Sequence, residues 1–116
     1  MSAGPVVQKQ RFKLIPCVFL ILRRGDEVLL SRRINTGYQD GKFGVVAGHV
    51  EGDELATHAL AREALEEAGI AVRPEDLRFV HVAHRLSRGE VGQERLDLFY
   101  EASVWQGEVT NQEPEK

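Results

Sequence analysis

The chain has 116 residues and a formal net charge of −3, with 42% hydrophobic and 28% charged residues. This length suits one small domain, and the balance of apolar and charged residues is that of a globular protein. The weak negative charge gives no general attraction to nucleic-acid backbones or anionic membranes. We therefore predict a single domain over residues 1–116, with no nucleic-acid polymer and no membrane among its partners.

The number of cysteines and the length of the apolar runs indicate in which cellular compartment the protein is expected. The single cysteine, Cys17, excludes an internal disulfide and a thiolate metal site. The longest apolar run, CVFLIL at 17–22, is too short to cross a bilayer, and the first residues lack the apolar core of a secretory signal. These features predict a soluble protein in a reducing, cytoplasmic setting.

Three strands are expected before any helix. The runs at 13–24 and 27–34 favour β structure, and Gly25-Asp26 between them is typical of a hairpin turn. Pro16 indicates that the first strand starts after it or lies at a sheet edge there. The polar, glycine-containing segment 35–44 predicts a loop, which leads into a short strand over 42–48.

A helix is predicted from about residue 54 to residue 68. Asp53 is the nearest side chain suited to capping its start, and Gly69 suits the left-handed position that ends a helix. Four apolar residues form the expected buried stripe, with the glutamates lying away from it: Leu55, Ala59, Leu65 and Ala68. Strands at 79–86 and 95–105 complete a β-β-β-α-β-β order, which predicts an α+β fold with one dominant helix.

Three glutamates stand close together on this helix. Glu63, Glu66 and Glu67 have the spacing i, i+3, i+4, which places like charges on one face at a cost of a few tenths of a kcal/mol per pair. Carboxylates are hard oxygen ligands suited to Mg²⁺ or Mn²⁺, so a cation would stabilise the cluster and assist attack of water on a phosphoanhydride. Taken alone, however, the three glutamates are more typical of a solvated helix face than of a metal site.

The residues around these glutamates decide between the two interpretations. The segment 48–70 matches G-x5-E-x7-R-E-U-x-E-E-x-G-U, where U is hydrophobic, at all of its fixed positions: Gly48, Glu54, Arg62, Glu63, Glu66, Glu67 and Gly69. At residue frequencies of roughly 5–7%, such a match arises by chance with a probability on the order of 10⁻⁹ per start. This pattern is the Nudix box, and the chain resembles a MutT-like Nudix hydrolase. The segments around 29–33 and 96–108 also resemble that family.

The resemblance implies a fold and an activity. The family fold is an α/β/α sandwich with a mixed β-sheet, and its enzymes hydrolyse a phosphoanhydride bond in a nucleoside diphosphate linked to another moiety. The implied function is therefore a nucleotide pyrophosphohydrolase that uses Mg²⁺, with Mn²⁺ as an alternative. A catalytically silent Nudix-like module that binds a nucleotide or a protein is the alternative function. Which nucleotide derivative is cleaved stays open.

The resemblance also implies roles inside the box. Glu63 and Glu67 would be the main metal ligands, joined by Glu66 and by the backbone carbonyl of Ala47. The general base would be Glu66 or Glu63. Arg62 would be held by Glu54 and would orient the catalytic glutamate, while the Gly48 backbone would lie close to the phosphates.

Outside the box the implied roles rest on position alone. Glu113 is a candidate for a further metal ligand, ahead of Glu108 and Glu94, and Arg33 for a phosphate contact. Tyr38 and Phe43 are candidates for stacking on a base. Each also has an ordinary interpretation, as a solvated charge or as an aromatic side chain of the core or rim.

One departure from the family pattern concerns the C-terminus. The family fold normally continues with another strand and a C-terminal helix, whereas this chain stops at Lys116. Either the product is truncated, or a partner subunit covers the sheet face that the helix would cover. Since a bare apolar face favours association, we predict a homodimer or poor solubility.

Overall fold

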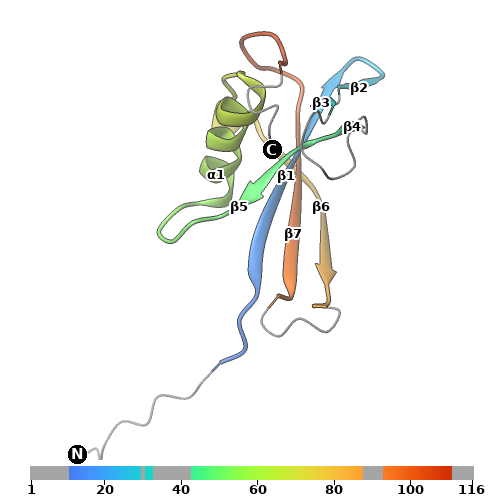
Figure 1. Ribbon diagram of the computed structural model, residues 1–116. Coiled ribbons are helices and arrows are strands. Elements are labelled where there is room, and N and C mark those ends of the chain that lie inside the picture. The colour runs from blue at the N-terminus through green and yellow to red at the C-terminus, as the bar shows by residue number, and fades with distance from the viewer. Residues whose placement is uncertain (1–10, 30, 33–42, 88–92, 111–116) are drawn as a thin grey trace, which may run out of the picture.

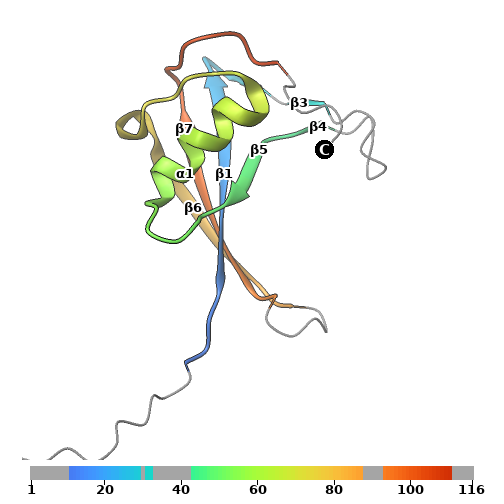
Figure 2. The same ribbon diagram turned by 60° about the vertical axis from the view of Figure 1, so that its left-hand side comes forward.

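Residues 11–29, 31–32, 43–87 and 93–110 are described by the structure, a computed structural model. They form one five-stranded sheet, a small two-stranded sheet and a helix (Figures 1 and 2). The strands of the larger sheet are β1 (Ile15–Arg24), β2 (Glu27–Leu29), β5 (Val46–His49), β6 (Arg78–Arg85) and β7 (Arg95–Ala102). The smaller sheet pairs β3 (Ser31–Arg32) with β4 (Phe43–Gly44).

Strand β1 is the centre of the larger sheet. It pairs antiparallel with β2 and β5, and parallel with β7. Strand β6 pairs antiparallel with β7 and lies at the edge of the sheet. The sheet is therefore mixed, and the predicted α+β class is confirmed.

The predicted hairpin is confirmed, with Gly25 in a left-handed conformation (φ 61°) between β1 and β2. Two predicted strands are each divided between the two sheets, so their single-strand prediction is wrong. The run 27–34 contains β2 and β3, and the run 42–48 contains β4 and the start of β5. At each point where one predicted strand becomes two, the sequence continues with residues that favour extended structure. The sequence therefore does not show where one strand ends and the next begins.

Of the two alternatives for Pro16, a strand that starts after the proline is wrong, because β1 begins at Ile15. Proline is tolerated at the first positions of a strand, where its missing N–H leaves little of the ladder unpaired. Its carbonyl accepts a hydrogen bond from the N–H of Val50 (3.1 Å).

The helix α1 (Ala56–Glu63) continues directly into a π-helical turn, η1 (Ala64–Ala68). Gly69 ends it in the left-handed conformation (φ 70°), as predicted. The predicted cap is wrong: Leu55 occupies the N-cap position without a side-chain bond, and Asp53 has a positive φ of 61° in the preceding turn. A short 3₁₀ turn, η2 (Pro74–Asp76), precedes β6.

The core lies between the helix and one face of the sheet. Ala59, Leu60, Ala64 and Ala68 are buried against Val18, Leu20 and Leu22 of β1. Two residues of the predicted stripe are instead exposed, Leu55 at 69% and Leu65 at 60%. Small alanines let the helix lie close to the sheet, and its buried face runs through Leu60 rather than Leu55. No helix in the described part of the chain is long and apolar enough to span a membrane.

Candidate active site

Among the described residues, one edge of β5 pairs with no other strand, and this free edge faces the carboxylates of the helix. The N–H of Ala47 donates to Oε2 of Glu67 (3.1 Å). Since the N–H and C=O of one strand residue point to the same side, the Ala47 carbonyl lies on this edge as well. Two residues along, the His49 carbonyl accepts a bond from Nη2 of Arg62 (3.2 Å), which is consistent with the same alternation. The opposite edge of β5 pairs with β1.

Glu63 lies directly over β5, where Gly48 leaves room for it. A Cβ atom added to Gly48 would lie 2.3 Å from Cδ and 2.6 Å from Oε1 of Glu63, far inside van der Waals contact. The Glu63 side chain is consequently only 14% exposed. The prediction that the glutamates lie away from the buried face is therefore wrong for Glu63.

Arg62 joins the acidic residues into one network. Its Nε and Nη2 donate to the two carboxylate oxygens of Glu54 (3.0 and 3.2 Å), and Nη1 donates to Glu63 (2.8 Å). A longer contact reaches Glu66 (3.5 Å), whose side chain is 49% exposed. The structure thus brings together the box residues Glu54, Arg62 and Glu63, with Glu66 at the rim.

The network contains more negative than positive charge. One guanidinium is surrounded by carboxylates, including that of Glu51 at 3.8 Å. The hydrogen bonds to Glu54 raise the pKa of Arg62, so its charge is permanent. The bond from Arg62, and then the N–H of Glu51, lower the pKa of Glu54. The excess charge is what a divalent cation would neutralise.

The lowered pKa of Glu54 predicts a pH-dependent contribution to stability. A carboxylate with a lowered pKa in the folded state stabilises the protein above its unfolded pKa of about 4.3 and loses this effect as the pH falls through the folded value. The stability difference between wild type and Glu54→Gln should therefore be largest near pH 7 and shrink toward pH 3, in urea unfolding. Glu27→Gln, an exposed change of the same charge, is the control. A difference that stays constant with pH would contradict the prediction.

Within the described residues, no three Asp, Glu, His or Cys side chains converge as a metal-binding group. Glu63 and Glu66 turn toward Arg62, and Glu67 turns toward the Ala47 amide. The donor types nevertheless suit Mg²⁺, because carboxylates and a backbone carbonyl gather at one strand edge.

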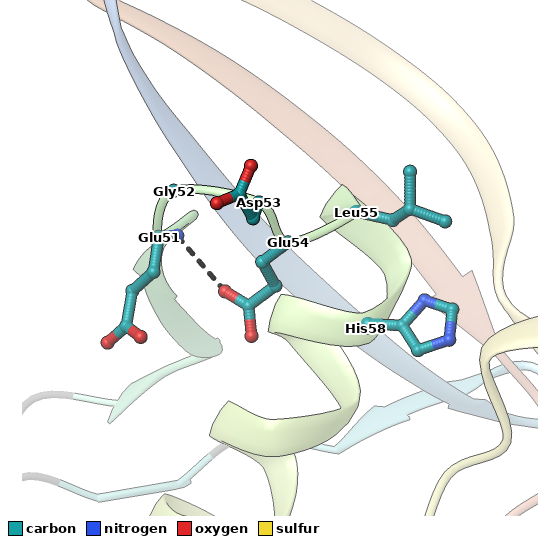
Figure 3. Close-up of a pocket in the computed structure, with 6 residues that line it drawn as sticks. All are labelled: Glu51, Gly52, Asp53, Glu54, Leu55 and His58. Carbon is teal, nitrogen blue, oxygen red and sulfur yellow. Dashed lines mark hydrogen bonds between the residues drawn. The ribbon is translucent and has the colours of Figure 1, made fainter.

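A depression of about 480 Å³ lies beside the network, at the turn before α1. Figure 3 shows the Glu54 carboxylate turned toward the Glu51 amide, and the His58 ring projecting away from both. The lining residues are Glu51, Gly52, Asp53, Glu54, Leu55 and His58. The depression shares Glu51 and Glu54 with the Arg62 network but does not include Glu63 or Glu67.

For the predicted site residues outside the box, the structure describes only some side chains. Arg33, Tyr38 and Glu113 fall outside the described residues, and for Phe43 only the backbone, in β4, is described. Glu94 contacts His84 (2.9 Å), and Glu108 is exposed. Sequence reasoning missed Glu51 and His49, whose contacts with Arg62 have no signal in the box spacing.

The protein is an α+β domain in which a glutamate-rich helix lies against a strand edge that carries no further strand among the described residues. The family model for the NUDIX domain matches residues 13–116. The chain belongs to the Nudix family.

Individual proteins agree with this assignment. The NAD-capped RNA hydrolases NudC of Salmonella typhi and Escherichia coli K12 are 40% identical over 68 residues, which are 59% of this chain and 25% of each relative. The chain therefore spans about a quarter of the length of these curated relatives. A MutT NUDIX hydrolase of Burkholderia pseudomallei has the same fold, with a TM-score of 0.75 at 24% identity, covering 89% of this chain and 77% of that one. The ORF135 protein of E. coli has a TM-score of 0.68 at 26% identity over 86% of this chain and 68% of that one.

Proposed function

We propose that the protein hydrolyses a phosphoanhydride bond in a nucleoside diphosphate linked to another moiety, and that it requires Mg²⁺ or Mn²⁺. Family membership supports the reaction class. The observation that carries the proposal is the free edge of β5, where Glu67 bonds the Ala47 amide and Glu63 lies against Gly48. Carboxylate and carbonyl oxygens therefore lie together at this edge, and these are the ligands that Mg²⁺ prefers.

Each box residue then has a specific role. Glu63, Glu67 and the Ala47 carbonyl would hold the cation, with Glu66 at the more exposed side. When bound, the cation neutralises phosphate oxygens and lowers the pKa of an attacking water. Glu66 or Glu63 accepts the proton of that water as its oxygen bonds to phosphorus and the bridging P–O bond breaks. Arg62, bonded to Glu54, restrains the orientation of Glu63.

A substrate panel tests the proposal. The panel contains a nucleoside triphosphate, ADP-ribose, a dinucleoside polyphosphate, NAD and an NAD-capped RNA, the last two because the NudC relatives are NAD-capped RNA hydrolases. We expect hydrolysis of at least one compound with Mg²⁺ or Mn²⁺, and none with excess EDTA. Binding without turnover would support the silent module instead, and turnover in EDTA would contradict the role of a cation.

The homodimer stays a prediction. It is supported by exposed apolar side chains on and just after the edge strand β6: Phe79, Val80, Val82 and Leu86, at 38–69% exposure. An unprotected strand edge with apolar side chains favours association.

A further inference from the structure

Four arginines lie on the sheet face opposite α1, and one of them differs from the rest. Arg23 and Arg78 bond Glu101 (2.9 and 3.5 Å), and Arg85 pairs with Asp97. Arg95 instead contacts Nε2 of His49 (3.0 Å) and Sγ of Cys17 (3.6 Å). Among the described residues, no carboxylate forms an ion pair with Arg95, so its charge faces an imidazole nitrogen and a thiol.

His49 connects this arginine to the active-site edge. Its carbonyl accepts a bond from Arg62, while its side chain lies on the opposite sheet face beside Arg95. Ala47 is two residues away on the same strand, about 7 Å along β5. Since His49 is exposed and Arg95 is half-buried, both can be reached from solvent.

The negative charge at the β5 edge means that a bound phosphate chain needs another positively charged side chain beside it. The glutamates repel a phosphate chain, and the Arg62 guanidinium is already bonded to Glu54 and Glu63. A guanidinium binds phosphate oxygens through paired, charge-assisted hydrogen bonds. Arg95 lies on the far face of the sheet beside the side chain of His49, whose carbonyl lies on the β5 edge.

We propose that Arg95 and His49 form an anion subsite that binds a second phosphate group of the substrate. The nature of the ligand rests on the proposed function, whereas the subsite itself rests on the charge of Arg95, which forms no ion pair with any described residue. Arg95 supplies the charge, and His49 holds the guanidinium toward the β5 edge.

Calorimetric titration of the full chain with inorganic tripolyphosphate, in EDTA and at fixed ionic strength, tests the subsite. Arg95→Gln should bind the probe about 10- to 100-fold more weakly than wild type, since a charge-assisted hydrogen bond is lost. Arg78→Gln is the matched control, because it removes the same charge from the same face at a residue already paired with Glu101. We expect it to change the affinity less than about twofold. Arg95→Lys should recover part of the binding.

These titrations distinguish binding at a specific subsite from general electrostatic attraction to positive charge. Equal losses in Arg95→Gln and Arg78→Gln, or no probe binding by the wild-type chain, would overturn it. Circular dichroism and thermal melting show whether the variants are folded. If no panel compound is hydrolysed while binding depends on Arg95, the proposed function fails and the subsite stands.

Discussion

Glu67→Gln is expected to lower kcat roughly 10²–10³-fold on whichever panel compound the wild type hydrolyses, while the protein remains folded. Glutamine has the same shape and can still accept the Ala47 N–H bond that Glu67 accepts (3.1 Å). The substitution therefore removes the negative charge and little else. Steady-state kinetics with Mg²⁺, together with thermal melting, measure the two effects separately.

Glu75→Gln serves as the control for Glu67→Gln. Glu75 lies on η2, is exposed, and pairs with Arg73 (2.9 Å), so the same change of charge occurs away from the β5 edge. Its kcat should stay within about twofold of wild type. Wild-type turnover in Glu67→Gln would remove Glu67 from the reaction.

Gly48→Ala is expected to reduce kcat/KM about 10- to 100-fold, because the new methyl group occupies the space of the Glu63 carboxylate. The atoms that it meets belong to a flexible side chain, so Glu63 moves and the backbone does not have to. Stability should change by no more than about 1 kcal/mol. Kinetics and urea unfolding of the same preparation measure both quantities.

A matched glycine and a double variant show whether Gly48 acts through Glu63. Gly52→Ala adds a methyl group with nothing within 4 Å and should keep wild-type kinetics. Adding Gly48→Ala to Glu63→Gln should cost little beyond Glu63→Gln alone, because both changes remove the same group. Fully additive losses would mean that Gly48 matters for another reason.

The resemblance to the Nudix box implied that Glu54, Arg62 and Glu63 would meet, and the reason is local. Glu54, Arg62 and Glu63 lie within ten residues of one another, so a turn and a helix start suffice to join them. The strand pairs that hold Gly48 and Ala47 in place are long-range. Parallel pairing of β1 with β7 joins residues about 80 positions apart, which periodicity cannot reveal.

The prediction of which helix face is buried differs most from the structure. Leu55 and Leu65 are its bulkiest apolar side chains besides Leu60, so the pattern favoured burying them. The structure buries alanines instead and turns Glu63 toward β5, where Gly48 provides space. The π-helical turn at Ala64–Ala68 shifts the residues after Glu63 relative to an α-helical register, and its sequence does not distinguish it from an ordinary helix.

The most direct measurement is the position of a bound cation. In a crystal soaked with Mn²⁺, we expect an anomalous difference peak within coordination distance of the Ala47 carbonyl and of the Glu63 and Glu67 carboxylates. The same peak should be lost in Glu67→Gln. A peak bound elsewhere, or none at saturating Mn²⁺, would contradict the assignment of the β5 edge as the catalytic metal site.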